Sequence, residues 1–372
     1  MTRHYLDHAS TSPLRPEARA ALVDALEMGL GDPGRIHEEG MTARAVVEQA
    51  RDQVAVLVGA RSREVVFTSG ATESIAAAVW GGASRGAHQV VPAVEHSAVR
   101  EHAARTGATT VVGVDRQGRV DPDEVLDAVG TDTGLVHLQW GNHEVATLQP
   151  VAEVVARCGE RGVLVHVDAA QAQGHVPIDF DGLGADLMSI SAHKMGGPPG
   201  VGALLVRRGL RLPALLVGGD QERARRAGHE NTPSIIAFGA AAAALSDDDR
   251  LGVESTSNRR QTQRVVDEAT RIEGIEAYGD PDDRLPHIVC LGIAGVEPQP
   301  VLIGLDRVGV AVHSGSSCAS ESLEPSPVLE AMGVDAHRSL RVSVGWSTTD
   351  SDIDALLDAL PRVIEDLRGL AG

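Results

Sequence analysis

Seven short apolar stretches that alternate with segments of helical character constrain the fold of this 372-residue chain more than any other feature. They occupy residues 65–68, 89–92, 109–114, 134–140, 162–167, 186–190 and 201–206. Strands joined by right-handed helical crossovers lie parallel in a sheet that is covered on both faces, so they consist of runs of Val, Leu and Ile. Because the chain has only three Phe, two Tyr and three Trp, such aliphatic residues must fill its core. We expect an α/β fold in which a mainly parallel seven-stranded sheet lies between helices.

The length of the chain predicts a second domain, because a single hydrophobic core seldom serves more than about 300 residues. An alanine-rich helix near 237–245 leads into three aspartates at 247–249, and we place the boundary there. We expect a large domain at 15–247 that begins with helices at 16–28 and 41–58. Residues 1–14 and 248–372 should form a smaller α+β domain with helices at 258–275, 298–308 and 350–367 and strands at 287–292 and 340–345.

The net charge of -19 argues against a nucleic-acid or anionic-membrane surface, because binding phosphate groups requires clustered cations. The first residues contain no apolar leader, and no apolar run approaches the length of a membrane span. We expect a cytoplasmic protein. Its three cysteines are odd in number and widely spaced, which argues against a disulfide framework and against a closed metal site. Cys158 and Cys290 should pack in a helix and a strand, whereas Cys318 lies in a Gly/Ser-rich loop that suits a functional thiol.

Polar residues directly follow four of the predicted strands, at 95–97, 141–144, 168–171 and 191–194. The carboxyl ends of parallel strands meet at one edge of a sheet, where ligands bind, so we expect these residues to share a site. Lys194 lies between His193 and a Gly-Gly-Pro-Pro-Gly turn. If Lys194 is partly buried, its pKa falls and it becomes an amine nucleophile for carbonyl compounds. The alternative is a surface lysine at the end of a strand.

The junction between the strand at 65–68 and the next helix has the composition of an anion site. Gly70 allows a sharp turn, and the N–H groups of Ala71 and Thr72 at the helix start can bind a phosphate. The alternative is a capping box with Ser69 or Thr72 as the cap. The junction lacks the lysine of ATP-binding loops and the glycine pattern of dinucleotide sites. With Asp168 as partner for a pyridinium nitrogen and Lys194 as Schiff-base amine, the three parts of a pyridoxal 5'-phosphate site are present.

Nine motifs distributed over nearly the whole chain resemble those of the cysteine desulfurases of the NifS/IscS type, which belong to the class V aminotransferases of fold type I. In chain order they are YLDHASTSP, FTSGATES, VEHSAV, NHEVATLQP, HVDAAQ, SISAHKMGGPPGVGAL, GGDQERARRAG, HSGSSCASESLEPSPVL and SLRVSVG. The resemblance implies an enzyme that removes sulfur from L-cysteine with pyridoxal 5'-phosphate, giving L-alanine and a persulfide on Cys318.

The resemblance also implies a role for each matching residue. Lys194 forms the Schiff base, Cys318 is the catalytic cysteine, and His96 stacks on the cofactor ring and transfers protons. Arg341 holds the substrate carboxylate, with Asn142 as a second substrate contact. The full set of implied cofactor-binding residues is Ala71, Thr72, His96, Asn142, His143, Asp168, Gln171, Ser191, His193, Lys194 and His229.

Four positions depart from the pattern of the family. His143 stands where an asparagine is common, His229 where a threonine reaches the phosphate of the neighbouring subunit, Ala146 where a glycine is usual and His313 where a serine is usual. An imidazole N–H could replace the asparagine as a donor. These departures keep a selenocysteine lyase, another class V enzyme and a catalytically degenerate cofactor-binding protein open as alternatives.

The resemblance further implies a homodimer, in which residues 218–228 contribute across the subunit interface. The persulfide would pass to a sulfur-acceptor protein, such as an iron-sulfur scaffold or a thiolation enzyme. The sequence does not identify the acceptor.

Overall fold

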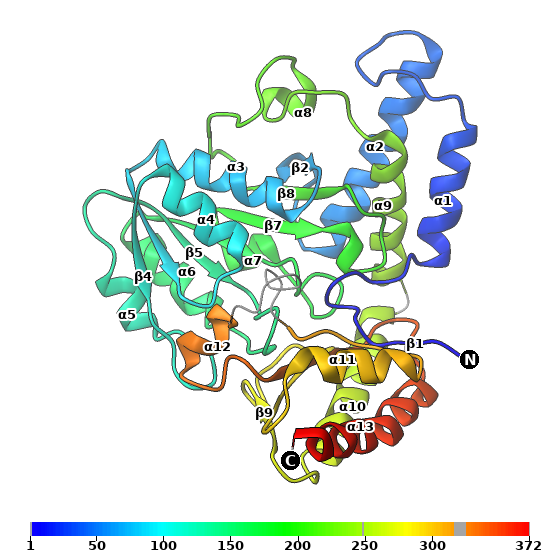
Figure 1. Cartoon of the computed structure of the whole chain (residues 1–372). Helices are drawn as coiled ribbons and strands as arrows, with labels where there is room; N and C mark the ends of the chain where they lie inside the picture. Colours follow the sequence, from blue (N-terminus) through cyan, green and yellow to red (C-terminus); the bar gives the residue numbers. More distant parts are fainter. Residues whose placement is uncertain (1, 248, 316–324, 372) are drawn as a thin grey trace.

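A computed structural model describes residues 2–247, 249–315 and 325–371 of the chain (Figure 1). Its central sheet has seven strands in the order β2-β8-β7-β6-β5-β3-β4. Their bounds are β2 (Val65–Thr68), β3 (His88–Pro92), β4 (Ala108–Val112), β5 (Thr133–Gln139), β6 (Leu164–Asp168), β7 (Leu187–Ser191) and β8 (Gly202–Val206). The prediction of a mainly parallel seven-stranded sheet is confirmed. Only β8 is reversed and runs antiparallel to both β2 and β7. The loop between β7 and β8 is too short for a crossover that would make the two strands parallel.

Both faces of the sheet are buried, which is why its strands are apolar throughout. Val65 and Phe67 on β2 point into the main core, while Val66 between them points into a separate cluster on the opposite face. Leu204 and Leu205 on β8 divide between the two faces in the same way. The alternation follows from the two-residue period of a strand, so the sheet is the middle layer of three.

Helices form the two outer layers of the large part. They are α1 (Pro16–Glu27), α2 (Glu38–Leu57), α3 (Ala71–Ala83), α4 (Ser97–Thr106), α5 (Pro122–Asp127), α6 (Val151–Glu160), α7 (Phe180–Leu183), α8 (Gln221–Ala224) and α9 (Thr232–Ser246), with short 3-10 turns at Ser62–Glu64 and Ala192–Lys194. In Figure 1, α1, α2 and α9 stand side by side at one end of the sheet, whereas α3 and α4 lie across it. Among the described residues, no helix is both long and apolar enough to cross a membrane.

A second core follows α9 in the chain. It is built by α10 (Arg250–Ala269), β9 (Ile275–Tyr278), β10 (Ile288–Ile293), α11 (Pro298–Arg307), β11 (Val310–Ala311), β12 (Ser339–Ser343) and α13 (Asp350–Ala371). The short helix α12 (Pro327–Met332) packs instead in a separate cluster with Val94 and Val145 of the large part. The antiparallel sheet β12-β10-β9 packs with α10, α11 and α13 around residues such as Val265, Leu305 and Leu356. The predicted helix at 258–275 is wrong at its end, because Gly274 adopts a positive φ of 77° and Ile275 pairs with Ile293 as part of β9.

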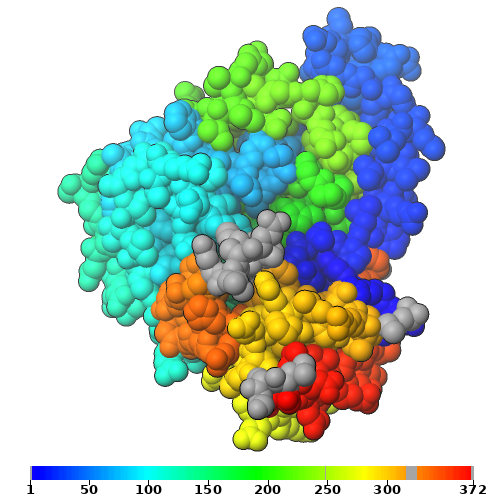
Figure 2. All heavy atoms as spheres, viewed as in Figure 1, coloured from blue at the N-terminus to red at the C-terminus, as the bar shows by residue number. Residues whose placement is uncertain are grey.

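The amino-terminal residues lie between the two cores. β1 (His4–Tyr5) pairs in parallel with β11, and Leu6 belongs to the second core. The chain then continues to Arg15, which begins the large part by donating from its backbone N–H to Gly196 O at 2.8 Å. Figure 2 shows this part of the chain in deep blue, between green atoms above and yellow atoms below.

Candidate active site

A cavity of about 520 Å³ lies at the carboxyl ends of β5, β6 and β7 and at the start of α3. The structure brings ten of the predicted site residues to its lining: Ala71, Thr72, His96, His143, Asp168, Gln171, Ser191, His193, Lys194 and Arg341. The amino-terminal residues Ala9, Ser10 and Thr11 also line it. The sequence assigned no role to these three residues, because nothing in their local pattern shows that they cross the edge of the sheet.

The start of α3 forms one wall of the cavity. Gly70 precedes the helix with φ 152° and ψ 179°, a conformation that only glycine adopts readily, and no side chain caps the helix there. The capping-box alternative is therefore wrong: the Ser74 hydroxyl bonds Thr68 Oγ1 at 2.8 Å, and neither Ser69 nor Thr72 caps the helix. The first N–H groups of the helix have no intrahelical acceptor and remain available to an anion.

The loop before α3 is fixed by an ion pair. Glu73 accepts from the backbone N–H of Ser69 at 2.9 Å and pairs with Arg226 Nε at 2.9 Å. Arg226 thus joins the 218–228 segment to the edge of the anion-binding wall.

The opposite side of the anion-binding wall is formed by the turn after β7. Ser191 Oγ lies 2.9 Å from His193 Nδ1. Gln173 holds Ser191 on both sides, accepting from its backbone N–H at 3.2 Å and donating to its carbonyl at 2.7 Å. Burial, together with the nearby Lys194, lowers the pKa of His193 to about 4, so the ring is neutral at physiological pH. The sequence analysis missed Gln173, although its position two residues after Gln171 was a signal.

Lys194 emerges from this turn into the cavity. Its Nζ donates to Ala9 O at 2.6 Å and to Ser10 O at 3.0 Å, and neither carbonyl carries a counter-charge. Burial and the positive charge of Arg341 lower its pKa to about 8, against the opposing effect of Asp7 and Asp168. The surface-lysine alternative is wrong, because the amine lies in a cavity and burial lowers its pKa toward neutral pH.

Asp168 ends β6 and lines the floor of the cavity. Its Oδ1 accepts from Ala170 N at 3.0 Å. Burial raises the pKa of this carboxyl, while the Ala170 hydrogen bond, His143 and Lys194 act in the opposite direction. A buried carboxylate of this kind is stabilised by a cationic partner, as a protonated ring nitrogen would be.

His96 and His143 lie next to each other in the cavity lining, with ring centroids 5.1 Å apart and planes at 68°. His96 Nδ1 accepts from Ala98 N at 3.1 Å at the start of α4, so Nε2 carries the proton of the neutral ring. Burial, then the neighbouring His143 and Lys194, lower the pKa of His96 to about 3. His143 Nδ1 is buried and has no hydrogen-bond partner among the described residues.

Arg341 reaches the cavity from β12. One Nη donates to His143 O at 2.9 Å, and the other donates to Asp7 Oδ1 at 3.1 Å and Ser10 Oγ at 2.8 Å. Its Nε is buried without a partner in the described part of the chain. The guanidinium, 3% exposed, is the cation that the smaller part contributes to the site.

Three predicted residues are not part of the cavity lining that the structure describes. Asn142 does not reach the cavity, because its Oδ1 accepts from Glu144 N and Val145 N at 2.8 Å each and its Nδ2 donates to Val94 O at 3.1 Å. These bonds shape the loop that carries His143, so the geometry gives Asn142 a positioning role and no direct ligand contact. Cys318 lies outside the described residues.

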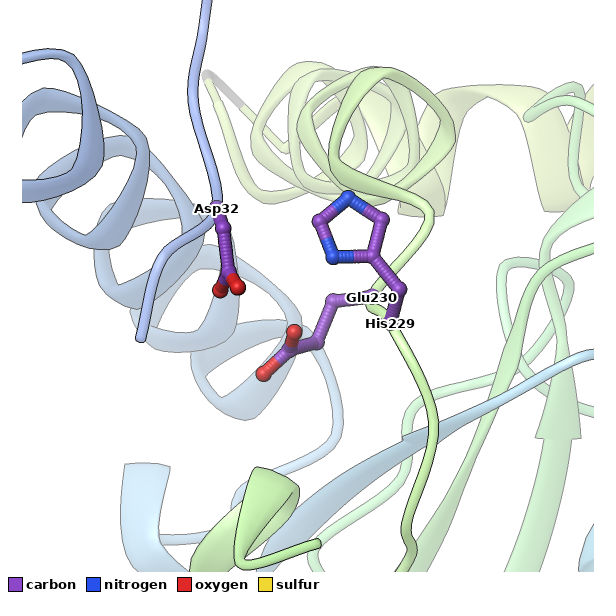
Figure 3. A group of neighbouring side chains, drawn as sticks. All are labelled: Asp32, His229 and Glu230. Atoms are coloured by element: carbon purple, nitrogen blue, oxygen red, sulfur yellow. The ribbon is translucent and has the colours of Figure 1, made fainter. Parts of the chain in front are cut away.

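His229 is the third of these residues. It lies beside Asp32 and Glu230, and Figure 3 shows the three side chains converging on one space. Their ligand-capable atoms lie within 4.8 Å of one another. The Asp32 carboxylate is already engaged by Gly34 N at 2.7 Å and by Arg35 Nε at 3.2 Å. His229 does not line the cavity of its own chain.

The two other thiols are buried, Cys158 on α6 and Cys290 on β10, as the sequence predicted. Burial raises the pKa of Cys158 to about 11 and raises that of Cys290 further. Since the thiolate is the nucleophile, neither residue is suited to carry sulfur.

The family model of the class-V aminotransferases matches residues 4–356. A cysteine desulfurase IscS from Dictyoglomus turgidum is 41% identical over 379 aligned residues, which cover 99% of this chain and 96% of that protein. A second cysteine desulfurase, IscS 1 from Archaeoglobus fulgidus, is 37% identical over 99% of this chain and 98% of its own length. Among solved structures, a NifS-like protein superposes with a TM-score of 0.91 at 28% identity, covering 98% of this chain and all of that one.

Proposed function

This chain belongs to the class-V aminotransferase family as a cysteine desulfurase, and we propose how its own residues carry out that activity. The proposed reaction removes sulfur from L-cysteine, releases L-alanine and leaves a persulfide on Cys318. The observation that supports it most is the convergence of a helix start, Asp168, Lys194 and Arg341 on one cavity.

The residues around the cavity fit pyridoxal 5'-phosphate. The uncapped start of α3, with Ser191 and His193 beside it, suits the phosphate, and Asp168 suits the ring nitrogen. Two residues of the lining, His143 and Arg341, each keep a buried nitrogen without a partner in the described chain. Buried polar atoms are rarely left unpaired, so a bound molecule that completes their hydrogen bonds fits this cavity.

When bound, the cofactor supplies a carbonyl group for amines and a ring that withdraws electrons from the substrate α-carbon. Lys194 would hold the cofactor through Nζ, and the unprotonated Nζ would be the base that accepts the proton of the substrate α-carbon. A pKa of about 8 suits both tasks, because about a tenth of the amine is unprotonated at pH 7, against less than about a thousandth for a lysine of ordinary pKa. Asp168 keeps the proton on the ring nitrogen by its negative charge.

Arg341 and His96 orient the substrate. The guanidinium of Arg341 binds the substrate carboxylate, for which its unpartnered Nε provides a donor beside the existing contacts. His96, neutral with the proton on Nε2, can donate a hydrogen bond from Nε2 into the cavity.

Cys318 attacks the substrate sulfur as a thiolate. A sulfur-sulfur bond forms, the carbon-sulfur bond breaks, and its electron pair stays on the carbon skeleton, which takes up a proton and becomes alanine. The described chain before Cys318 supports this role, because His313 pairs with the backbone of Arg341 and Gly315 lies beside the Arg341 side chain. The segment that carries Cys318 thus begins at the rim of the cavity.

The proposal is tested with Cys318→Ala and Lys194→Ala. Cys318→Ala should abolish alanine release and persulfide formation while the bound cofactor keeps its absorbance, whereas Lys194→Ala should lose the Schiff-base absorbance itself. Cys158→Ala, which removes a buried thiol of raised pKa, is the matched control and should turn over cysteine normally. Alanine release by Cys318→Ala at the rate of the unmodified chain would refute the assignment.

We further propose that the protein is a cytoplasmic homodimer that passes its sulfur to an acceptor protein. Ile36, Met41 and Val217 expose 92%, 57% and 82% of their side chains, as residues at a subunit interface would in a single chain. Light scattering should give about twice the mass of the chain. Mixing the persulfide form with candidate acceptors, iron-sulfur scaffolds and thiolation enzymes, should identify the acceptor by the sulfur that it gains.

A further inference from the structure

A stacked pair of buried imidazoles lies directly behind the cavity. His175 and His287 have ring centroids 3.5 Å apart and planes at 8°, and they are 5% and 0% exposed. His175 lies in the turn after β6, whereas His287 lies immediately before β10 of the smaller sheet. We propose that these two histidines are positioning residues that fix Gln171 and Lys194 relative to each other, an inference that rests on the proposed function.

Each ring holds one of the two cavity residues. His287 Nε2 lies 3.3 Å from Gln171 Oε1, and His175 Nε2 lies 3.2 Å from the carbonyl oxygen of Lys194. Gln171 and Lys194 also share a partner on the cavity side, because Ala9 O accepts from Gln171 Nε2 at 2.9 Å and from Lys194 Nζ at 2.6 Å. Gln171 and Lys194 are therefore linked through Ala9 in front and through the imidazole stack behind.

The hydrogen bonds determine the tautomers of both rings. Gln171 Oε1 and the Lys194 carbonyl are acceptors, so both rings carry their proton on Nε2. Burial lowers the pKa of His175 to about 4 and lowers that of His287 well below its ordinary value, which keeps both rings neutral at physiological pH. His287 Nδ1 is the unprotonated nitrogen of this tautomer, and it has no partner among the described residues. Two neutral rings can stack at 3.5 Å without charge repulsion.

The stack of His175 and His287 also connects the strand pair that carries Arg341 with the turn that carries Lys194. The carbonyl of His287 accepts from Val344 N at 2.9 Å, three residues after Arg341, and β10 pairs with β12 so that Cys290 lies opposite Arg341. Arg341 and His287 consequently move as one unit, and the stack sets this unit against the turn that carries Lys194. Loss of His287 would leave Gln171 Oε1 buried without a donor and free the amide to turn over.

The test measures the binding of pyridoxal 5'-phosphate to the apoprotein, separately from turnover. His287→Leu should weaken binding about three- to tenfold, the factor that one neutral hydrogen bond supplies, and should shift the absorbance of the Lys194 adduct. His287→Gln, whose amide can reach Gln171, should recover most of the affinity, whereas the shorter His287→Asn should not. If His287→Leu does not fold, the comparison of Gln with Asn answers the same question.

His166→Leu is the matched control. His166 is also 0% exposed, but it bonds Ser189 at 2.8 Å inside the sheet and contacts neither Gln171 nor Lys194. It should lower stability and leave cofactor affinity unchanged. Because His287 acts through Gln171, adding His287→Leu to Gln171→Leu should weaken binding less than twofold further.

Unchanged affinity and absorbance in both His287→Leu and His287→Asn would overturn the inference while leaving the proposed function intact. An equal loss of affinity in His166→Leu would also overturn it, since the effect would then be general destabilisation. If the unmodified chain did not bind the cofactor, the proposed function would fail together with this inference.

Discussion

Glu222→Gln should destabilise this protein more than most single substitutions, because it breaks a buried ion pair. Arg51 on α2 donates to both carboxylate oxygens of Glu222 at 2.7 Å, and the residues are 3% and 5% exposed. The same carboxylate accepts from Phe67 N at 2.9 Å, and the guanidinium lies over the Phe67 ring at 4.6 Å. Glutamine is nearly isosteric but offers one acceptor and one donor, so the buried charge of Arg51 would lose its buried counter-charge and keep only the exposed Glu48.

Removing one partner of such a pair costs about 3–5 kcal/mol in the free energy of unfolding. The residues that follow make the pair more important, because Glu222, Arg223 and Ala224 adopt positive φ values of 48°, 59° and 60°. A non-glycine residue held in that region costs about 1–3 kcal/mol, which the surrounding contacts must offset. The pair with Arg51 is the strongest described contact that anchors this turn.

Urea unfolding monitored by circular dichroism would measure the loss. The control is Glu48→Gln, because Glu48 pairs with the same arginine at 3.1 Å but is 44% exposed, and an exposed pair is worth about 0–1 kcal/mol. A loss below about 1 kcal/mol for Glu222→Gln, or equal losses for the two variants, would refute the reasoning from burial.

Three further outcomes are expected. The free energy of unfolding should have its highest value above about pH 6.5 and should fall as the pH decreases toward 4. The cause is buried His175: its pKa is lowered to about 4 in the folded chain, so the unfolded chain binds this proton more readily. This ring alone accounts for about 2 kcal/mol at pH 5, and urea titrations showing no fall between pH 7.5 and 5 would contradict the assignment. Gly202→Ala should lower the free energy of unfolding by about 1–3 kcal/mol and weaken cofactor binding, because a Cβ there would lie 2.7 Å from Gly70 Cα. The control Gly113→Ala, which has open space around it, should change neither quantity measurably. Arg341→Lys should raise the KM for cysteine at least tenfold and leave cofactor affinity within about twofold, because lysine lacks the planar fork that binds a carboxylate; an unchanged KM would remove Arg341 from the substrate site.

The sequence by itself determined the central sheet and most of the cavity lining. Strand periodicity and aliphatic composition are local properties, so the seven strands could be located from the pattern alone. Nine of the ten predicted residues in the lining lie there because the strands of the central sheet bring the residues that follow them to a common edge, whereas Arg341 comes from β12 of the smaller sheet. The position of Lys194 after its strand left both a surface lysine and a buried amine of lowered pKa open, and burial in the fold decided for the second.

Only the tertiary structure decided the features that depend on contacts between distant segments. His287 and Gln171 are 116 residues apart, and Lys194 and Ala9 are 185 apart, so no local pattern could pair them. The inward turn of Asn142, the reversal of β8 and the end of α10 at Ala269 likewise follow from hydrogen-bond partners and loop lengths that the folded chain supplies. The sequence therefore identified which side chains could perform the chemistry, and packing determined which of them meet and which ones hold the others in place.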